Sequence, residues 1–71
     1  MSDIQERLRI LFDYWIEHNR EHEQEFRDWA DKAASLSEVV QQLHEAAARM
    51  TDASNCLEKA RQALIKSKEG G

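Results

Sequence analysis

The sequence contains no proline, and its only two glycines are the last residues, Gly70 and Gly71. Proline and glycine disfavour the interior of a helix most strongly, so no such residue interrupts the chain before its end. The single cysteine, Cys56, excludes an intrachain disulfide and suits a reducing compartment, so we expect a cytoplasmic protein. No stretch approaches the roughly 20 consecutive apolar residues of a membrane span, and the N-terminus shows no secretory signal. We therefore expect no membrane association.

The chain is instead rich in charge and in good helix formers. Charged residues make up 34% of its 71 residues, and the net charge is −4. An excess of acidic residues disfavours nucleic acid as a partner. A chain of this length allows one domain with a modest core. The composition therefore predicts a single all-α domain of long helices.

Two serines indicate where the helices begin. Ser2 with Gln5, and Ser35 with Glu38, match the S-x-x-[EQ] pattern of a capping box. The predicted domain covers residues 1–71, with helix 1 at about 3–34, a turn at about 34–36, helix 2 at about 36–67 and a disordered tail at 68–71. Because no glycine marks the turn, one continuous helical rod is the alternative.

Apolar residues recur at alternating spacings of four and three, which is the heptad pattern of coiled-coil-like packing. In helix 1 the stripe consists of Leu8, Phe12, Trp15, Asn19, His22, Phe26, Trp29 and Ala33. In helix 2 it consists of Val39, Leu43, Ala46, Met50, Ala53, Leu57, Ala60 and Leu64. Packing the two stripes together predicts an antiparallel two-helix hairpin.

A hairpin alone leaves many apolar residues uncovered. One seam between two helices gives a thin core, and helix 1 carries more apolar residues than that seam needs. An exposed apolar patch of this kind marks an interface. We therefore predict a homodimer in which two hairpins form a four-helix bundle, with a helix of another protein as the alternative partner. The predicted interface consists of Ile4, Leu8, Leu11, Phe12, Trp15, Ile16, Asn19 and His22.

The run EHNREH at residues 17–22 allows two interpretations. Asn19 and His22 lie on the predicted seam, where polar residues fix the register and the partner, and this interpretation needs no cofactor. Alternatively, His18, His22 and Glu25 form an i, i+4, i+7 stripe with ligands that suit Zn, Ni or Cu. One hairpin offers too few ligands for such a site, so a dimer would have to complete it.

The same run contains H-x-x-E-H, the inverted zinc-protease motif, with Glu21 in the place of the general base. Such an enzyme needs a third ligand from another segment and a substrate cleft, which two helices do not provide. We therefore predict no enzymatic activity and no catalytic residues. The sequence favours a non-enzymatic protein–protein interaction or self-association module, with a transition-metal-binding helical bundle as the alternative.

One stretch resembles a prokaryotic family of small, uncharacterised helical domains with a W-I-E-H-N-x-E-H signature. The matching residues are Trp15, Ile16, Glu17, His18, Asn19, Glu21, His22, Phe26, Trp29 and Ala30. The resemblance implies a helical hairpin and carries no established activity. Members that adjoin Cys/His-rich segments favour metal binding, whereas this chain has no such segment.

Overall fold

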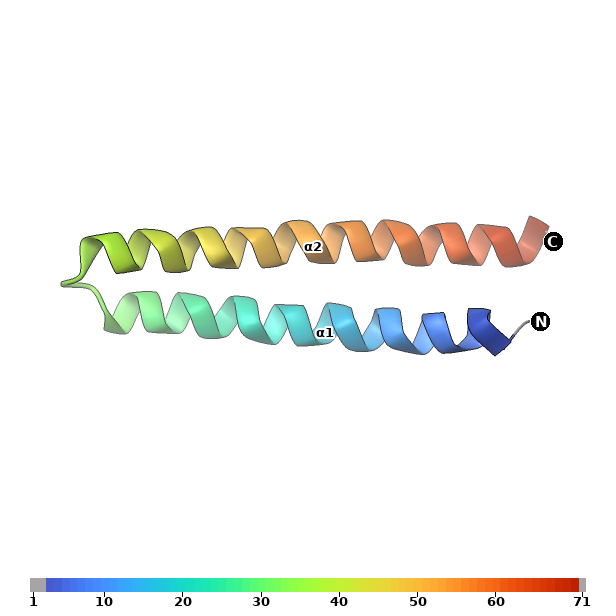
Figure 1. Ribbon diagram of the computed structural model, residues 1–71, viewed down its shortest axis with the longest axis horizontal. Coiled ribbons are helices and arrows are strands. Elements are labelled where there is room, and N and C mark those ends of the chain that lie inside the picture. The colour runs from blue at the N-terminus through green and yellow to red at the C-terminus, as the bar shows by residue number, and fades with distance from the viewer. Residues whose placement is uncertain (1–2, 71) are drawn as a thin grey trace.

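The computed structural model describes residues 3–70, and the side chains of residues 3–67 among them. Helix α1 covers Asp3–Lys32 and helix α2 covers Ser37–Gly70. The two helices lie side by side and run in opposite directions, with the turn at one end of the molecule (Figure 1). The described chain measures 54 × 14 × 11 Å. The predicted antiparallel hairpin is therefore confirmed, and the chain does not continue as a single rod.

The helix ends differ slightly from the predicted boundaries. Helix α1 ends at Lys32 rather than near residue 34, and α2 continues to Gly70, beyond the start of the predicted tail at residue 68. Residue 71 and the predicted cap Ser2 lie outside the described residues.

The turn shows which residue begins α2. The backbone N–H of Val40 donates to the carbonyl of Leu36 at 2.9 Å, which is the first intrahelical bond of α2. Leu36 is therefore the N-cap residue, one position after the predicted cap Ser35. The Leu36 side chain has no oxygen to offer the free N–H groups of the first turn. No described residue has a positive φ, so the turn requires no glycine. This explains why no glycine indicates the turn in the sequence.

Ion pairs three or four residues apart line the solvent-exposed surface of each helix. On α1, Arg7 pairs with Asp3 at 3.3 Å and Arg9 pairs with Glu6 at 3.1 Å. On α2, Arg49 lies 3.7 Å from Glu45 and 3.3 Å from Asp52. Each such pair stabilises a helix by about 0.2–0.5 kcal/mol. Most of the helical stability therefore has to come from packing between α1 and α2.

The packed seam of α1 differs from the predicted seam at alternate positions. Phe12 is buried as predicted, but Ile16 (3% exposed) and Ala30 (1% exposed) take the places predicted for Trp15 and Trp29. The two tryptophans are 37% and 54% exposed. A step of one residue turns a side chain about 100° around the helix, so the rings lie beside the seam. The prediction that both tryptophans lie on the seam is wrong.

The packed seam of α2 shows the same displacement. Ala47 and Ser54 are buried, in the places predicted for Ala46 and Ala53. Near the turn, Val40 is half-buried, whereas Val39 is exposed. Both helices are therefore rotated by about one residue from the predicted arrangement at these positions. The remaining predicted positions, such as Leu43 on α2, are half-buried as expected of a narrow seam.

Candidate functional site

The hairpin has two side surfaces, and they follow from the displaced seam. Residue numbers advance clockwise around α1 and anticlockwise around α2 when both helices are viewed along α1, because the helices are right-handed and antiparallel. Residues that directly precede seam positions on α1 and on α2 therefore lie on the same side of the hairpin. Residues that directly follow seam positions lie together on the other side. The chemical character of the two sides is different.

The side that precedes the seam is apolar, and we name it the apolar flank. Its large members come mainly from α1, and all of them are more than a third exposed. Small, half-buried alanines from α2 continue the same surface. The apolar flank consists of Ile4, Leu11, Trp15 and Trp29 from α1 and of Val39, Ala46, Ala53 and Ala60 from α2.

The opposite side is bridged by charge, and we name it the charged flank. Arg20 of α1 lies 2.6 Å from Glu58 of α2, and Asp13 of α1 lies 2.6 Å from Arg61 of α2. The α1 residue with the lower number pairs with the α2 residue with the higher number, as antiparallel helices require. Each of these partly exposed pairs contributes at most about 1 kcal/mol to the stability of the hairpin. Together they place charged side chains of both helices on this side of the hairpin.

The predicted interface residues fall into three groups. Phe12 and Ile16 are buried between α1 and α2 and so belong to the core of the hairpin itself. Ile4, Leu11 and Trp15 are exposed on the apolar flank. The half-buried members are Leu8, Asn19 and His22.

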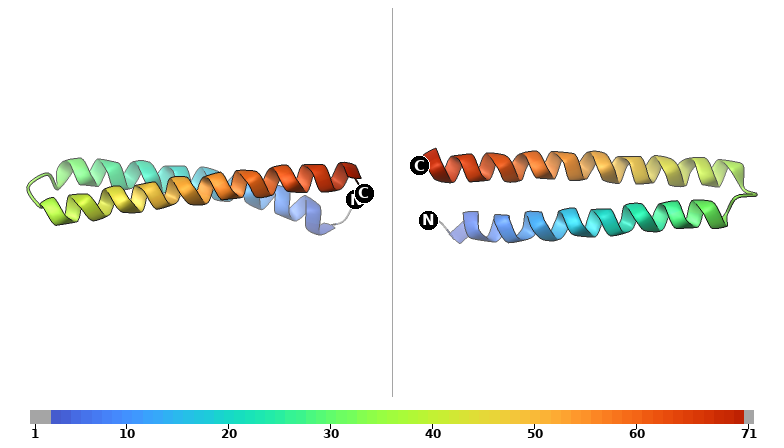
Figure 2. Two further views of the ribbon diagram at one scale, coloured as in Figure 1. Left: turned by 90° about the horizontal axis from the view of Figure 1, so that it is seen from above. Right: turned by 180° about the vertical axis from the view of Figure 1, so that it is seen from behind.

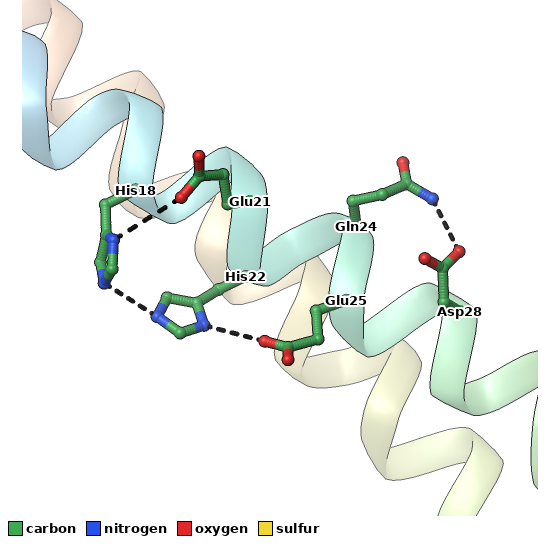
Figure 3. A pocket seen from close by; sticks show the side chains of 6 residues that line it. All are labelled: His18, Glu21, His22, Gln24, Glu25 and Asp28. Atoms are coloured by element: carbon green, nitrogen blue, oxygen red, sulfur yellow. Dashed lines mark hydrogen bonds and ion pairs between the residues drawn. The ribbon is translucent and has the colours of Figure 1, made fainter.

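The two neighbouring histidines lie side by side on α1 (Figure 3). The Nε2 atom of His18 lies 3.0 Å from the Nε2 atom of His22. The other ring nitrogen of each histidine faces a carboxylate: His18 Nδ1 lies 3.8 Å from Glu21 Oε1, and His22 Nδ1 lies 3.4 Å from Glu25 Oε1. Contacts link the four side chains in the order Glu21, His18, His22 and Glu25 on the surface of α1.

Two aromatic rings flank the histidine pair along the same helix. The Tyr14 ring stacks on His18 with 5.5 Å between centroids, and the Phe26 ring stacks on His22 with 5.9 Å between centroids. The two imidazoles are themselves nearly perpendicular, at 88°. Tyr14 lies four residues before His18 and Phe26 four after His22, and neither ring was predicted from the sequence to stack on a histidine.

The three predicted metal ligands do not gather around one point. Glu25 lies at the Nδ1 edge of the His22 ring, whereas His18 lies at the Nε2 edge (Figure 3). Within residues 3–70, no group of three or more His, Cys, Asp or Glu side chains is arranged to hold a metal ion. The imidazoles of His18 and His22 bring two nitrogen atoms within 3.0 Å of each other. Cys56 is exposed on α2.

None of the described helices is long and apolar enough to cross a membrane.

The fold and its surfaces define a small two-helix hairpin with one apolar side. Residues 8–64 match the family model described as "Domain of unknown function (DUF8180)", and the chain belongs to this family. It is 36% identical over 56 residues to an uncharacterised protein of Archaeoglobus fulgidus, an alignment that covers 78% of this chain and 90% of that protein. No solved structure matches the chain. The expected membership in an uncharacterised family of small proteins is confirmed, and the family brings no activity with it.

Proposed function

We propose that the chain is a non-enzymatic helical module that self-associates through its apolar flank, so that two hairpins form a four-helix bundle. The observation that carries this proposal is the row of exposed large apolar side chains along the apolar flank, among them Leu11, Trp15 and Trp29. In contrast, the hairpin buries only four apolar residues among those described. Covering the apolar flank would remove this exposed apolar surface from water and so favour association. Its lone cysteine, Cys56, suits a cytoplasmic site of action.

The shape of the apolar flank favours a second copy of this chain over an unrelated helix. The α1 part carries large side chains such as Trp15 and Trp29, whereas the α2 part carries small ones such as Ala46 and Ala53. A twofold axis parallel to the helices would place the α1 part of each copy against the α2 part of the other. Large side chains such as Trp15 would then face small ones such as Ala53, which is the arrangement that close packing requires. The flank is therefore complementary to itself.

Charge substitutions on the apolar flank test this proposal. The double substitution Leu11→Glu and Trp29→Glu places a carboxylate at two exposed positions, so the hairpin itself should remain helical. In a dimer both charges would be buried without a partner, and we expect dissociation to monomers. Sedimentation velocity at micromolar concentration, with circular dichroism for helix content, measures both properties. Ile16→Glu is unsuitable, because Ile16 is buried within the hairpin and its loss would unfold each copy.

Ile65→Glu is the matched control, because Ile65 is also an exposed aliphatic residue but directly follows a seam position, Leu64, on the side of the charged flank. This variant should remain a dimer. A wild-type chain that stays a folded monomer over a 100-fold dilution series would refute self-association. A double variant that still sediments as the wild-type dimer would show that the interface lies elsewhere.

A further inference from the structure

We propose that His18 and His22 form a two-imidazole site for a divalent transition metal, with Cu²⁺ or Ni²⁺ preferred over Zn²⁺. In this site Glu21 and Glu25 orient the two rings and do not bind the ion. Both ligands come from one α1 helix, so the site goes beyond self-association and needs no second copy. His18 directly precedes the seam position Asn19 and therefore lies on the same side of the hairpin as the apolar flank, so a dimer would bring the histidine pairs near its interface.

The protonation of the two rings provides the first argument. A neutral imidazole carries one proton, on Nδ1 or on Nε2, and the other nitrogen is a bare acceptor. The carboxylates of Glu21 and Glu25 favour a proton on the Nδ1 atoms that face them. The two Nε2 atoms lie at hydrogen-bond distance, 3.0 Å, so one donates to the other when it carries the proton. When both protons are on Nδ1, both Nε2 atoms are acceptors and repel each other. A cation between or beside them removes this conflict, because both lone pairs can bind it.

The distance between the two Nε2 atoms provides the second argument. Bonds from an imidazole nitrogen to a divalent metal are about 2.0–2.1 Å long. Two nitrogens 3.0 Å apart therefore subtend an angle of roughly 94° at an ion bound by both at that bond length. This value is close to the 90° of square-planar and octahedral complexes, whereas tetrahedral ligands would be about 3.3 Å apart. Tetragonal and square-planar geometries with nitrogen ligands favour Cu²⁺ and Ni²⁺, and tetrahedral geometry favours Zn²⁺.

The surroundings of the pair provide the third argument. Histidines that bind metals usually donate the other ring N–H to a carboxylate, which fixes the ring and strengthens the ligand. Each histidine has a carboxylate facing Nδ1, at 3.4 Å for His22 and, beyond hydrogen-bond distance, at 3.8 Å for His18. The stacked rings of Tyr14 and Phe26 limit the rotation of the imidazoles further. The histidine side chains are partly exposed, at 48% and 41%, so an ion can reach them from water. Water or the histidine pair of a second copy would supply the remaining ligands.

Calorimetric titration of the untagged chain with Cu²⁺, Ni²⁺ and Zn²⁺ tests the site. We expect saturable binding of no more than one ion per chain, with Ni²⁺ binding more tightly than Zn²⁺ and Cu²⁺ most tightly of the three. His18→Ala and His22→Ala should each weaken Ni²⁺ binding at least tenfold, since each removes one of two ligands. Binding should also weaken as the pH falls, because protons compete with the ion for the imidazole nitrogens.

Four further variants separate a built site from nonspecific binding to surface histidines. Exchanging residues 17 and 18 (Glu17→His with His18→Glu) keeps the composition but turns one imidazole about 100° away from His22, so binding should fall as in the alanine variants. His44→Ala removes the remaining histidine and should leave binding unchanged. Glu25→Gln should weaken binding about threefold to tenfold, and Glu17→Gln, which removes the same charge beside the pair, should have a smaller effect.

Two results would overturn the proposal. If the exchanged variant binds Ni²⁺ as tightly as the wild type, the pair is not the site. If Zn²⁺ binds more tightly than Ni²⁺ and both alanine variants lose it, the pair binds metal but the proposed geometry is wrong. Circular dichroism of each variant confirms that helix content is unchanged, so a loss of binding cannot come from unfolding. Sedimentation of the same samples shows whether self-association is affected separately.

Discussion

At the scale of single residues, Ser54 is the least favourable member of the hairpin core. It is buried on the seam of α2, and its Oγ atom has no hydrogen-bond partner among the described residues. A buried hydroxyl without a partner has lost its hydrogen bonds to water and gained none. We predict that Ser54→Ala raises the free energy of unfolding by about 1 kcal/mol, because it removes this cost and alanine favours helix more than serine. Urea denaturation followed by circular dichroism measures the change.

Ser67→Ala is the control for that substitution. Ser67 is exposed near the end of α2, so the same chemical change there tests helix propensity alone. Its effect should not exceed about 0.5 kcal/mol. Equal effects at both positions would show that burial of the Ser54 hydroxyl costs nothing.

The sequence predicted the histidine pair but not its surroundings. A spacing of four residues places His18 and His22 on one side of a helix wherever the helix lies, so their proximity follows from the sequence. The position of Glu25 depends on side-chain torsions as well as spacing, and it faces the Nδ1 edge of His22 rather than a shared point with His18. A spacing of three or four residues fixes which side chains are neighbours, but it does not fix which atoms face each other.

At the scale of helices, periodicity identified both elements but not their rotation. Trp15 and Ile16 are adjacent and both apolar, so either one continues the heptad pattern. The same holds for Val39 and Val40 and, with small residues, for Ala46 and Ala47. Ile16 is buried in place of Trp15 because the smaller side chain allows the two helices to approach closely, whereas a tryptophan ring would hold them apart. Ala46 and Ala47 have equal size, so the position buried on α2 follows from the way α1 packs against it.

The start of α2 offers a second prediction. Leu36 occupies the N-cap position and has no side-chain acceptor for the backbone N–H groups of residues 38 and 39. Leu36→Ser supplies a hydroxyl at this position, and we expect it to be more stable than Leu36→Ala by about 1 kcal/mol. Both variants lose the exposed leucine side chain, so their difference in the free energy of unfolding isolates the cap. No difference would mean that Ser35 or water already satisfies those groups.

At the scale of the whole molecule, the two flanks could not be predicted from either helix alone. Asp13 and Arg20 are scattered charges in the sequence, and they form one surface with Glu58 and Arg61 only because the helices are antiparallel and rotated as described. The apolar flank arises in the same way from residues of both helices. Self-association was predicted from an excess of apolar residues on helix 1 and stays a proposal, and the structure shows which of these residues share one exposed side.

The hairpin also determines the order in which its parts can form. The turn lies at one end of the molecule. The start of α1 and the end of α2 lie together at the opposite end, as Figure 1 and the two views of Figure 2 show. Facing residues are separated by about 10 positions near the turn and by about 55 at the open end, so closing the longer loop costs roughly 1.5 kcal/mol more entropy. Folding should therefore begin at the turn and proceed toward the open end.

Leu43 and Leu64 are both half-buried leucines on α2. Leu43 lies near the turn and Leu64 lies far from it. In stopped-flow measurements at one protein concentration, Leu43→Ala should mainly slow folding, with a φ-value above about 0.5, and Leu64→Ala should mainly speed unfolding, with a φ-value below about 0.3. The reverse order would mean that the open end, and not the turn, forms the folding nucleus.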